Sequence, residues 1–67
     1  MSGVHKDYEK SNNAIRFAAR KLSNNPDVPK NITDAEIIEA VGFEMGRPLT
    51  EPIQHRVCVR AFREAMQ

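Results

Sequence analysis

Cysteine and long apolar runs are both scarce in this 67-residue sequence. Cys58 is the single cysteine, so no disulfide can form within the chain. A lone thiol in a small domain is typical of a reducing compartment, which favours the cytoplasm. The first residues are polar, which argues against a signal peptide, and no apolar run approaches the roughly 18 residues of a membrane-spanning helix. We therefore expect a small cytoplasmic domain that does not enter a membrane.

Residues that carry catalytic or metal chemistry are few as well. The three glycines are scattered, so they form no phosphate-binding loop. His55 and Cys58 are spaced i, i+3 and can reach one ion, but zinc takes four ligands, and only His5 and scattered carboxylates remain. A catalytic thiol must be exposed and activated, whereas Cys58 falls on an apolar helix face. We therefore expect no enzyme activity, no bound metal and no cofactor.

Helical periodicity with two breaks predicts an all-α fold. Apolar residues recur with helical spacing over about 6–22, 34–45 and 51–66, and no stretch shows the alternation of a strand. In the first segment, Tyr8, Ile15 and Leu22 share one face. A loop that contains Pro26 and Pro29 ends this segment. The sequence therefore predicts one compact three-helix domain over residues 1–67.

The second segment has the clearest helix start in the chain. Thr33 is a good N-cap residue, and Glu36 lies three positions later, which is the spacing of a capping box. Ile32 precedes the cap and Ile37 is the fourth helical residue, which is the spacing of a hydrophobic staple. These residues predict a helix that begins directly after Thr33.

Two glycines shape the end of this second segment. Gly46 is expected to follow the last helical residue, and Pro48 blocks any continuation. Gly42 lies inside the segment, where a glycine costs about 1 kcal/mol relative to alanine. It permits a close helix approach or marks an early helix end, and the sequence leaves both interpretations open.

The apolar faces of the three segments are expected to meet in one core. The third segment carries an apolar arc made of Val57, Cys58, Ala61, Phe62 and Ala65. Cys58 is therefore expected to be a small, buried core residue. The centre of the core is expected to contain Ile15, Leu22, Ile37, Val41, Val57 and Phe62.

The opposite arc of the third segment is basic. Arg56, Arg60 and Arg63 fall there, and a guanidinium group is a forked donor that suits phosphate and carboxylate. The arc is either an ordinary solvated face or a surface that follows a DNA backbone or meets an acidic partner. The exclusive use of arginine favours a binding role, because lysine would serve a solvated face equally well.

An aromatic residue lies among cations on the polar side of the first segment. Phe17 falls there together with Lys10, Arg20 and Lys21. Phe17 either packs under the loop or against the third helix, or it is exposed in a basic patch that suits a protein partner or nucleic acid. The formal net charge of the chain is only +1, with basic ends and an acidic middle, so ordinary solvated faces remain an alternative.

The stretch TDAEIIEAVGF at residues 33–43 resembles the first helix and turn of helix-turn-helix DNA-binding domains. The segment from Thr50 onward then resembles the second, recognition helix. By this resemblance, Gln54, His55, Arg56 and Arg60 would lie nearest to bases and phosphates, and Arg63 continues the same basic face.

Two functions of different classes follow from these patterns. One is a small, non-enzymatic DNA-binding regulator of helix-turn-helix type. The other is a small adaptor or inhibitor, of the kind encoded by phages and plasmids, that docks on a larger host protein. Phe17 and the mixed charge pattern favour the second, and a structural subunit or homodimer is a third interpretation.

Overall fold

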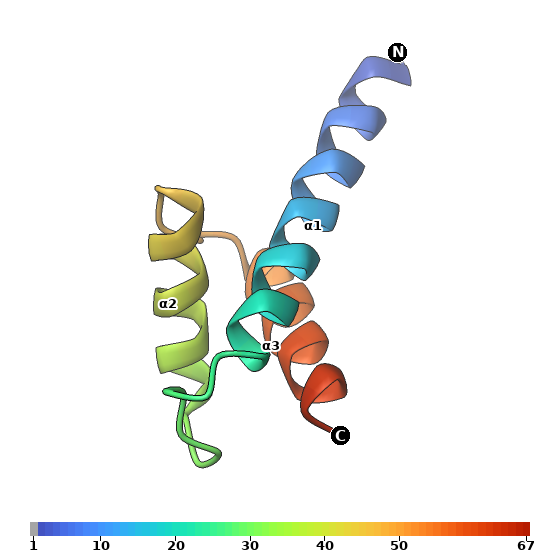
Figure 1. The fold of residues 1–67 in the computed structure, drawn as a ribbon. Coiled ribbons are helices and arrows are strands. Elements are labelled where there is room, and N and C mark those ends of the chain that lie inside the picture. Colours follow the sequence, from blue (N-terminus) through green and yellow to red (C-terminus); the bar gives the residue numbers. More distant parts are fainter. Residues whose placement is uncertain (1) are drawn as a thin grey trace.

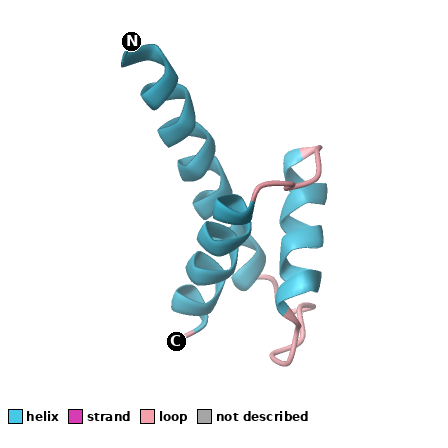
Figure 2. Ribbon diagram, turned by 180° about the vertical axis from the view of Figure 1, so that it is seen from behind, coloured by secondary structure: helices cyan, strands magenta, loops and turns pink. Residues whose placement is uncertain are grey.

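The computed structural model describes the backbone of residues 2–67 and the side chains of residues 12–67. Within these residues the chain forms three helices, α1 (Ser2–Ser23), α2 (Asp34–Met45) and α3 (Pro52–Met66), and no strand. Helix α2 runs antiparallel to α1 and α3, and the N-terminal turns of α1 project beyond the other two helices (Figures 1 and 2). The all-α, three-helix fold is thereby confirmed.

The ends of two helices differ slightly from the expected ones. Helix α1 begins at Ser2 rather than near residue 6, because no proline interrupts the residues before the apolar pattern begins. Helix α3 begins at Pro52, with Glu51 as its N-cap, because proline is favoured in the first helical turn.

The start of α2 is held by the expected capping box. The Thr33 hydroxyl accepts a hydrogen bond from the Glu36 backbone N–H at 3.2 Å. The Glu36 carboxylate accepts bonds from the backbone N–H and the hydroxyl of Thr33, at 3.0 Å and 2.9 Å. These two donors lower the pKa of Glu36, because they stabilise its charged form. Ile32 and Ile37 are both buried, as the staple spacing predicted.

The end of α2 explains both glycines. Gly46 adopts the left-handed conformation at φ 81°, which an L side chain rarely adopts. Helix α2 continues through Gly42 to Met45, so Gly42 does not mark an early end. A Cβ atom at Gly42 would lie 3.1 Å from the Arg47 carbonyl oxygen and 3.2 Å from Pro48 Cα. Gly42 therefore permits close approach of the following loop rather than of another helix.

One apolar core joins all three helices. It contains Ile15, Ala18 and Ala19 of α1, Ile37 and Val41 of α2, and Cys58, Ala61 and Phe62 of α3, with Ile32 and Leu49 from the loops. Leu22 and Val57 are only partly buried at its edge. Ala65 is exposed, contrary to its expected place on the buried arc, because the last turn of α3 extends beyond the end of α1 (Figure 1).

Three polar side chains tie the elements to one another. One Arg63 nitrogen donates to the Ile32 carbonyl oxygen and to the Asp34 carboxylate, each at 2.9 Å, which fixes α3 to the start of α2. Lys21 of α1 forms an ion pair with Glu44 of α2 at 3.5 Å. The His55 ring bonds to the Leu49 carbonyl oxygen, which fixes the loop before α3. In the described part of the chain, no helix has the length and apolar character needed to cross a membrane.

Candidate anion-binding groove

A groove between α1 and α3 gathers four arginines on one surface. Arg16 and Arg20 come from α1, and Arg56 and Arg60 come from α3. The groove has a volume of about 380 Å³, and its remaining lining consists of Ile53, Val57, Ala61 and Glu64. As far as the described side chains form it, the groove is cationic, with a largely apolar floor and one carboxylate.

Helix geometry places these four guanidinium groups together. Each pair is spaced i, i+4, so its members share a helix face and are separated by about 6 Å along the helix axis. Arg16 and Arg20 directly follow the buried residues Ile15 and Ala19, and Arg60 directly precedes the buried Ala61. A residue adjacent to a buried position lies about 100° around the helix, at the edge of the buried face. Packing of α1 on α3 then brings the two basic edges to the same groove.

Within residues 12–67, one ion pair involves an arginine of the groove. Arg60 Nε lies 3.6 Å from the Glu64 carboxylate, but both side chains are more than half exposed, so the pair is weak. One Arg16 nitrogen donates to the side-chain oxygen of Asn13 at 2.8 Å, which orients that guanidinium without neutralising it. Guanidinium groups bind phosphates and carboxylates through paired N–H donors. The groove therefore presents several forked donors to an extended anion whose charges are regularly spaced.

The structure separates the residues that were predicted to contact nucleic acid on α3. Arg56 and Arg60 line the groove, whereas Arg63 points to the other side of α3 and is bound to Asp34 and to the Ile32 carbonyl oxygen. The Gln54 side-chain oxygen accepts bonds from the Thr50 and Glu51 backbone N–H groups, at 3.2 Å and 3.1 Å, and so caps α3. These intramolecular bonds give Gln54 and Arg63 a structural role.

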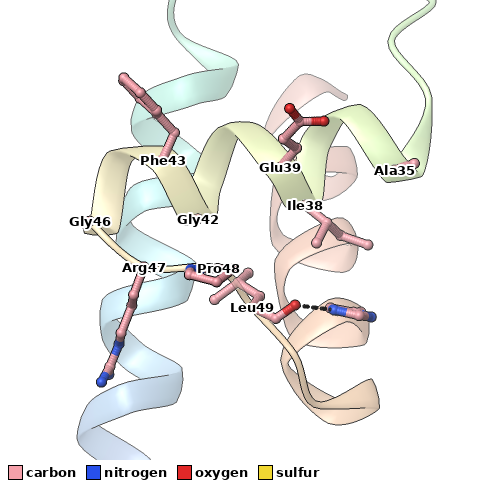
Figure 3. Close-up of a pocket in the computed structure, with 10 residues that line it drawn as sticks. Ala35, Ile38, Glu39, Gly42, Phe43, Gly46, Arg47, Pro48 and Leu49 are labelled. Carbon is pink, nitrogen blue, oxygen red and sulfur yellow. Dashed lines mark hydrogen bonds between the residues drawn. The ribbon is translucent and has the colours of Figure 1, made fainter.

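His55 lies away from the groove as well. Its ring is half-buried and bonds to the Leu49 carbonyl oxygen, as the dashed line in Figure 3 shows. The residue lines a hollow on α2, and it also lines a second hollow, on α3, that lies outside the arginine groove. The helix-turn-helix resemblance grouped His55 with Arg56 and Arg60, and these three residues line one hollow.

The basic patch predicted on α1 is also divided. Arg20 lines the groove, whereas Lys21 pairs with Glu44 of α2. Phe17 is 66% exposed, which decides between the two interpretations of this residue in favour of exposure. It lies on the face of α1 opposite the buried Ile15, because two positions correspond to about 200° around a helix. Lys10 lies outside the residues whose side chains the structure describes.

Sequence reasoning missed Arg16 as a member of the site. Its signal was the i, i+4 spacing to Arg20, combined with a buried neighbour at each position. The sequence alone assigned Arg20 to one predicted patch and Arg56 and Arg60 to another, because it does not give the contact between α1 and α3. In the structure, these arginines line one groove.

The described residues show no arrangement typical of a metal or thiol centre. Among them, no three His, Cys, Asp or Glu side chains lie close enough together to hold a metal ion. Cys58 is fully buried in the core, as expected. Burial raises the pKa of its thiol to about 11, because the thiolate would lose its hydration. The groove between α1 and α3 therefore remains the strongest candidate for binding chemistry.

Comparison of the chain with protein-family models, with curated proteins and with solved structures gave no match. Helices α2 and α3 are joined by residues 46–51, and this connection includes the left-handed Gly46 and the buried Leu49.

Proposed function

We propose that this protein binds DNA through the groove between α1 and α3, as a small non-enzymatic regulator of helix-turn-helix type. The observation that supports the proposal is the alignment of two arginine pairs, one from each helix, along a single groove. A duplex presents regularly spaced phosphates, and its affinity for a protein rises with the number of phosphates that lysine or arginine neutralises. The buried, lone Cys58 agrees with a cytoplasmic location for this activity.

Helix α3 is the element that we assign to the DNA groove. Arg56 and Arg60 lie on its exposed face, together with Ile53, which is 40% exposed. In this arrangement Arg16 and Arg20 of α1 contact phosphates at the edge of the same DNA groove. Phosphate contacts set the position of the protein on the duplex, and contacts to base edges give sequence preference.

The start of α2 is unsuited to a phosphate contact. A helix N-terminus normally attracts anions through its backbone N–H groups. Here the Thr33 hydroxyl already accepts one of these N–H groups, and the carboxylates of Asp34 and Glu36 lie in the first turn. Their negative charge repels phosphate. The proposal therefore assigns phosphate contacts to the arginine groove rather than to this helix end.

The test is a salt titration of affinity for fluorescently labelled duplex DNA. Each neutralised phosphate contributes about −0.9 to the slope of log K against log salt. Arg20→Ala and Arg60→Ala should each flatten the slope by about 0.9 and weaken binding to all sequences alike. Lys30→Ala is the matched control, because it removes one exposed charge from the loop outside the groove and should leave the slope unchanged.

Two results would contradict this proposal. One is the absence of measurable DNA binding at roughly 50 mM salt, where electrostatic contacts are strong. The other is an equal change in the slope of log K against log salt for Lys30→Ala and Arg20→Ala, because the groove would then have no special role in binding.

A second candidate function is docking on a larger protein as an adaptor or inhibitor. The exposed Phe17 favours it, because an aromatic anchor at an interface can contribute 2 kcal/mol or more. Phe17→Ala should spare DNA binding and impair docking, whereas Arg60→Ala should impair binding to an acidic partner. A pull-down from lysate with and without nuclease separates the two functions, because only a protein partner would be retained after nuclease treatment.

A further inference from the structure

The outer face of α2 carries an apolar hollow beside a fully projecting aromatic ring. The hollow has a volume of about 750 Å³, and Ile38, Gly42, Pro48 and Leu49 supply apolar surface to it. Phe43 lies at its edge and is 88% exposed, the highest value among the large hydrophobic residues of the described side chains. Figure 3 shows the Phe43 ring directed away from the hollow rather than into it.

The folding of the loop onto α2 creates this hollow. Gly42 has no side chain, so the backbone of residues 47–49 packs directly against the helix. The bond from the Arg47 N–H to the Gly42 carbonyl oxygen, at 3.0 Å, and the bond from the His55 ring to the Leu49 carbonyl oxygen hold the loop in this position. The hollow is therefore part of the folded framework. It lies on a different set of residues from the arginine groove.

The rim of the hollow carries opposite charges. Glu39 and Arg47 both line it, and Figure 3 shows their side chains on opposite sides of the helix axis. A two-fold axis that passes through the hollow beside Gly42, between these two side chains, would place Glu39 of one copy opposite Arg47 of the other, and the reverse.

We propose that this face binds a second copy of the chain in a two-fold symmetric dimer. In that dimer the Phe43 ring of each copy fills the apolar hollow of the other, beside Gly42. The two contacts between Glu39 and Arg47 fix the antiparallel register of the α2 helices. An exposed ring next to an apolar hollow is self-complementary under a two-fold operation, and burial of both removes apolar surface from water.

Sedimentation equilibrium without nucleic acid tests the proposal, over protein concentrations from roughly 1 µM to 1 mM. The wild type should change from monomer to dimer within this range. Phe43→Ser should raise the dissociation constant at least tenfold, because it removes the central anchor. Phe17→Ser is the matched control, because Phe17 is also exposed but lies on α1, and the dissociation constant should stay unchanged.

Charge reversal provides a second, independent readout. Glu39→Arg alone or Arg47→Glu alone should weaken the dimer, because each places like charges opposite one another. The double variant should restore association, because the attractive pairs are re-formed with reversed sign. Restoration excludes simple unfolding as the cause of the single-variant effects, and circular dichroism spectra of all variants should match the wild type.

Several outcomes would overturn the proposal. They are a wild type that remains monomeric to 1 mM, an equal effect of Phe17→Ser and Phe43→Ser, and a double charge reversal that fails to restore association. If the wild type is monomeric and its Phe43 face binds a different protein, that protein is the partner of this face and a second copy of the chain is not. None of these outcomes bears on the arginine groove, because the experiment contains no nucleic acid.

Discussion

Replacement of Thr33 by alanine tests the local interaction on which the start of α2 depends. The hydroxyl of Thr33 accepts the Glu36 backbone N–H at 3.2 Å and donates to the Glu36 carboxylate at 2.9 Å. Thr33→Ala removes both bonds but keeps the bond from the Thr33 backbone N–H to the carboxylate, at 3.0 Å. The variant therefore removes the side-chain half of the capping box.

The expected loss in the free energy of unfolding is about 1 kcal/mol, which is typical when alanine replaces a capping residue. A domain of this size has a net stability of roughly 3–5 kcal/mol, so the loss is a substantial fraction. The melting temperature should fall by about 4–8 °C, because the unfolding entropy of a small domain is small. Thr33→Ser is the matched control, since it keeps a hydroxyl at the same position, and its melting temperature should stay close to that of the wild type.

The same substitution should change the dependence of stability on pH. The folded-state pKa of Glu36 is lowered by the two donors of Thr33, first by the backbone N–H and then by the hydroxyl. The stability that this carboxylate contributes is therefore present above its unfolded pKa and is lost as the pH falls through the lower folded pKa. Thr33→Ala keeps only the backbone donor, so the gap in melting temperature between variant and wild type should narrow on acidification.

Thermal unfolding followed by circular dichroism, at neutral and at acidic pH, measures the melting temperatures of the wild type and of both Thr33 variants. An unchanged melting temperature in Thr33→Ala would show that the capping box does not stabilise α2. A fall in Thr33→Ser as large as in Thr33→Ala would show that the hydroxyl bonds are not the cause.

Three other substitutions or treatments probe the core and the contacts between helices. Cys58 should react with a thiol reagent much more slowly in the native state than in denaturant, because it is fully buried and its pKa is raised to about 11; equal rates would place it outside the core. In urea titrations, Arg63→Ala should lower the free energy of unfolding by about 1 kcal/mol, because the variant loses two hydrogen bonds. Arg60→Ala should change the free energy of unfolding by less than about 0.5 kcal/mol, because the ion pair that it loses is exposed. Equal losses in these two variants would contradict the assigned roles. Gly42→Ala should destabilise the protein, because the new Cβ would lie 3.1 Å from the Arg47 carbonyl oxygen. This contact should outweigh the preference of a helix for alanine over glycine, which is about 1 kcal/mol. A raised melting temperature would mean that the loop moves aside.

The local sequence determined where α2 begins and ends. The capping box of Thr33 and Glu36 and the left-handed Gly46 act over a span of four residues or fewer, so their consequences can be predicted without knowledge of the rest of the fold. The core residues Ile15, Ile37 and Phe62 were also predictable, because helical periodicity assigns each apolar residue to a face. These signals are contained in spacing alone.

Only the tertiary structure decided which polar side chains act together. Arg63 shares the basic arc of α3 with Arg56 and Arg60 in the sequence pattern, but the packing of α3 against the start of α2 gives it Asp34 as a partner. Arg16 joins Arg56 and Arg60 because α1 lies against α3 at one particular rotation. Periodicity assigns a residue to a face of its own helix, whereas the neighbour of that face depends on how the helices cross. For this reason the candidate site became visible only once the three helices were packed.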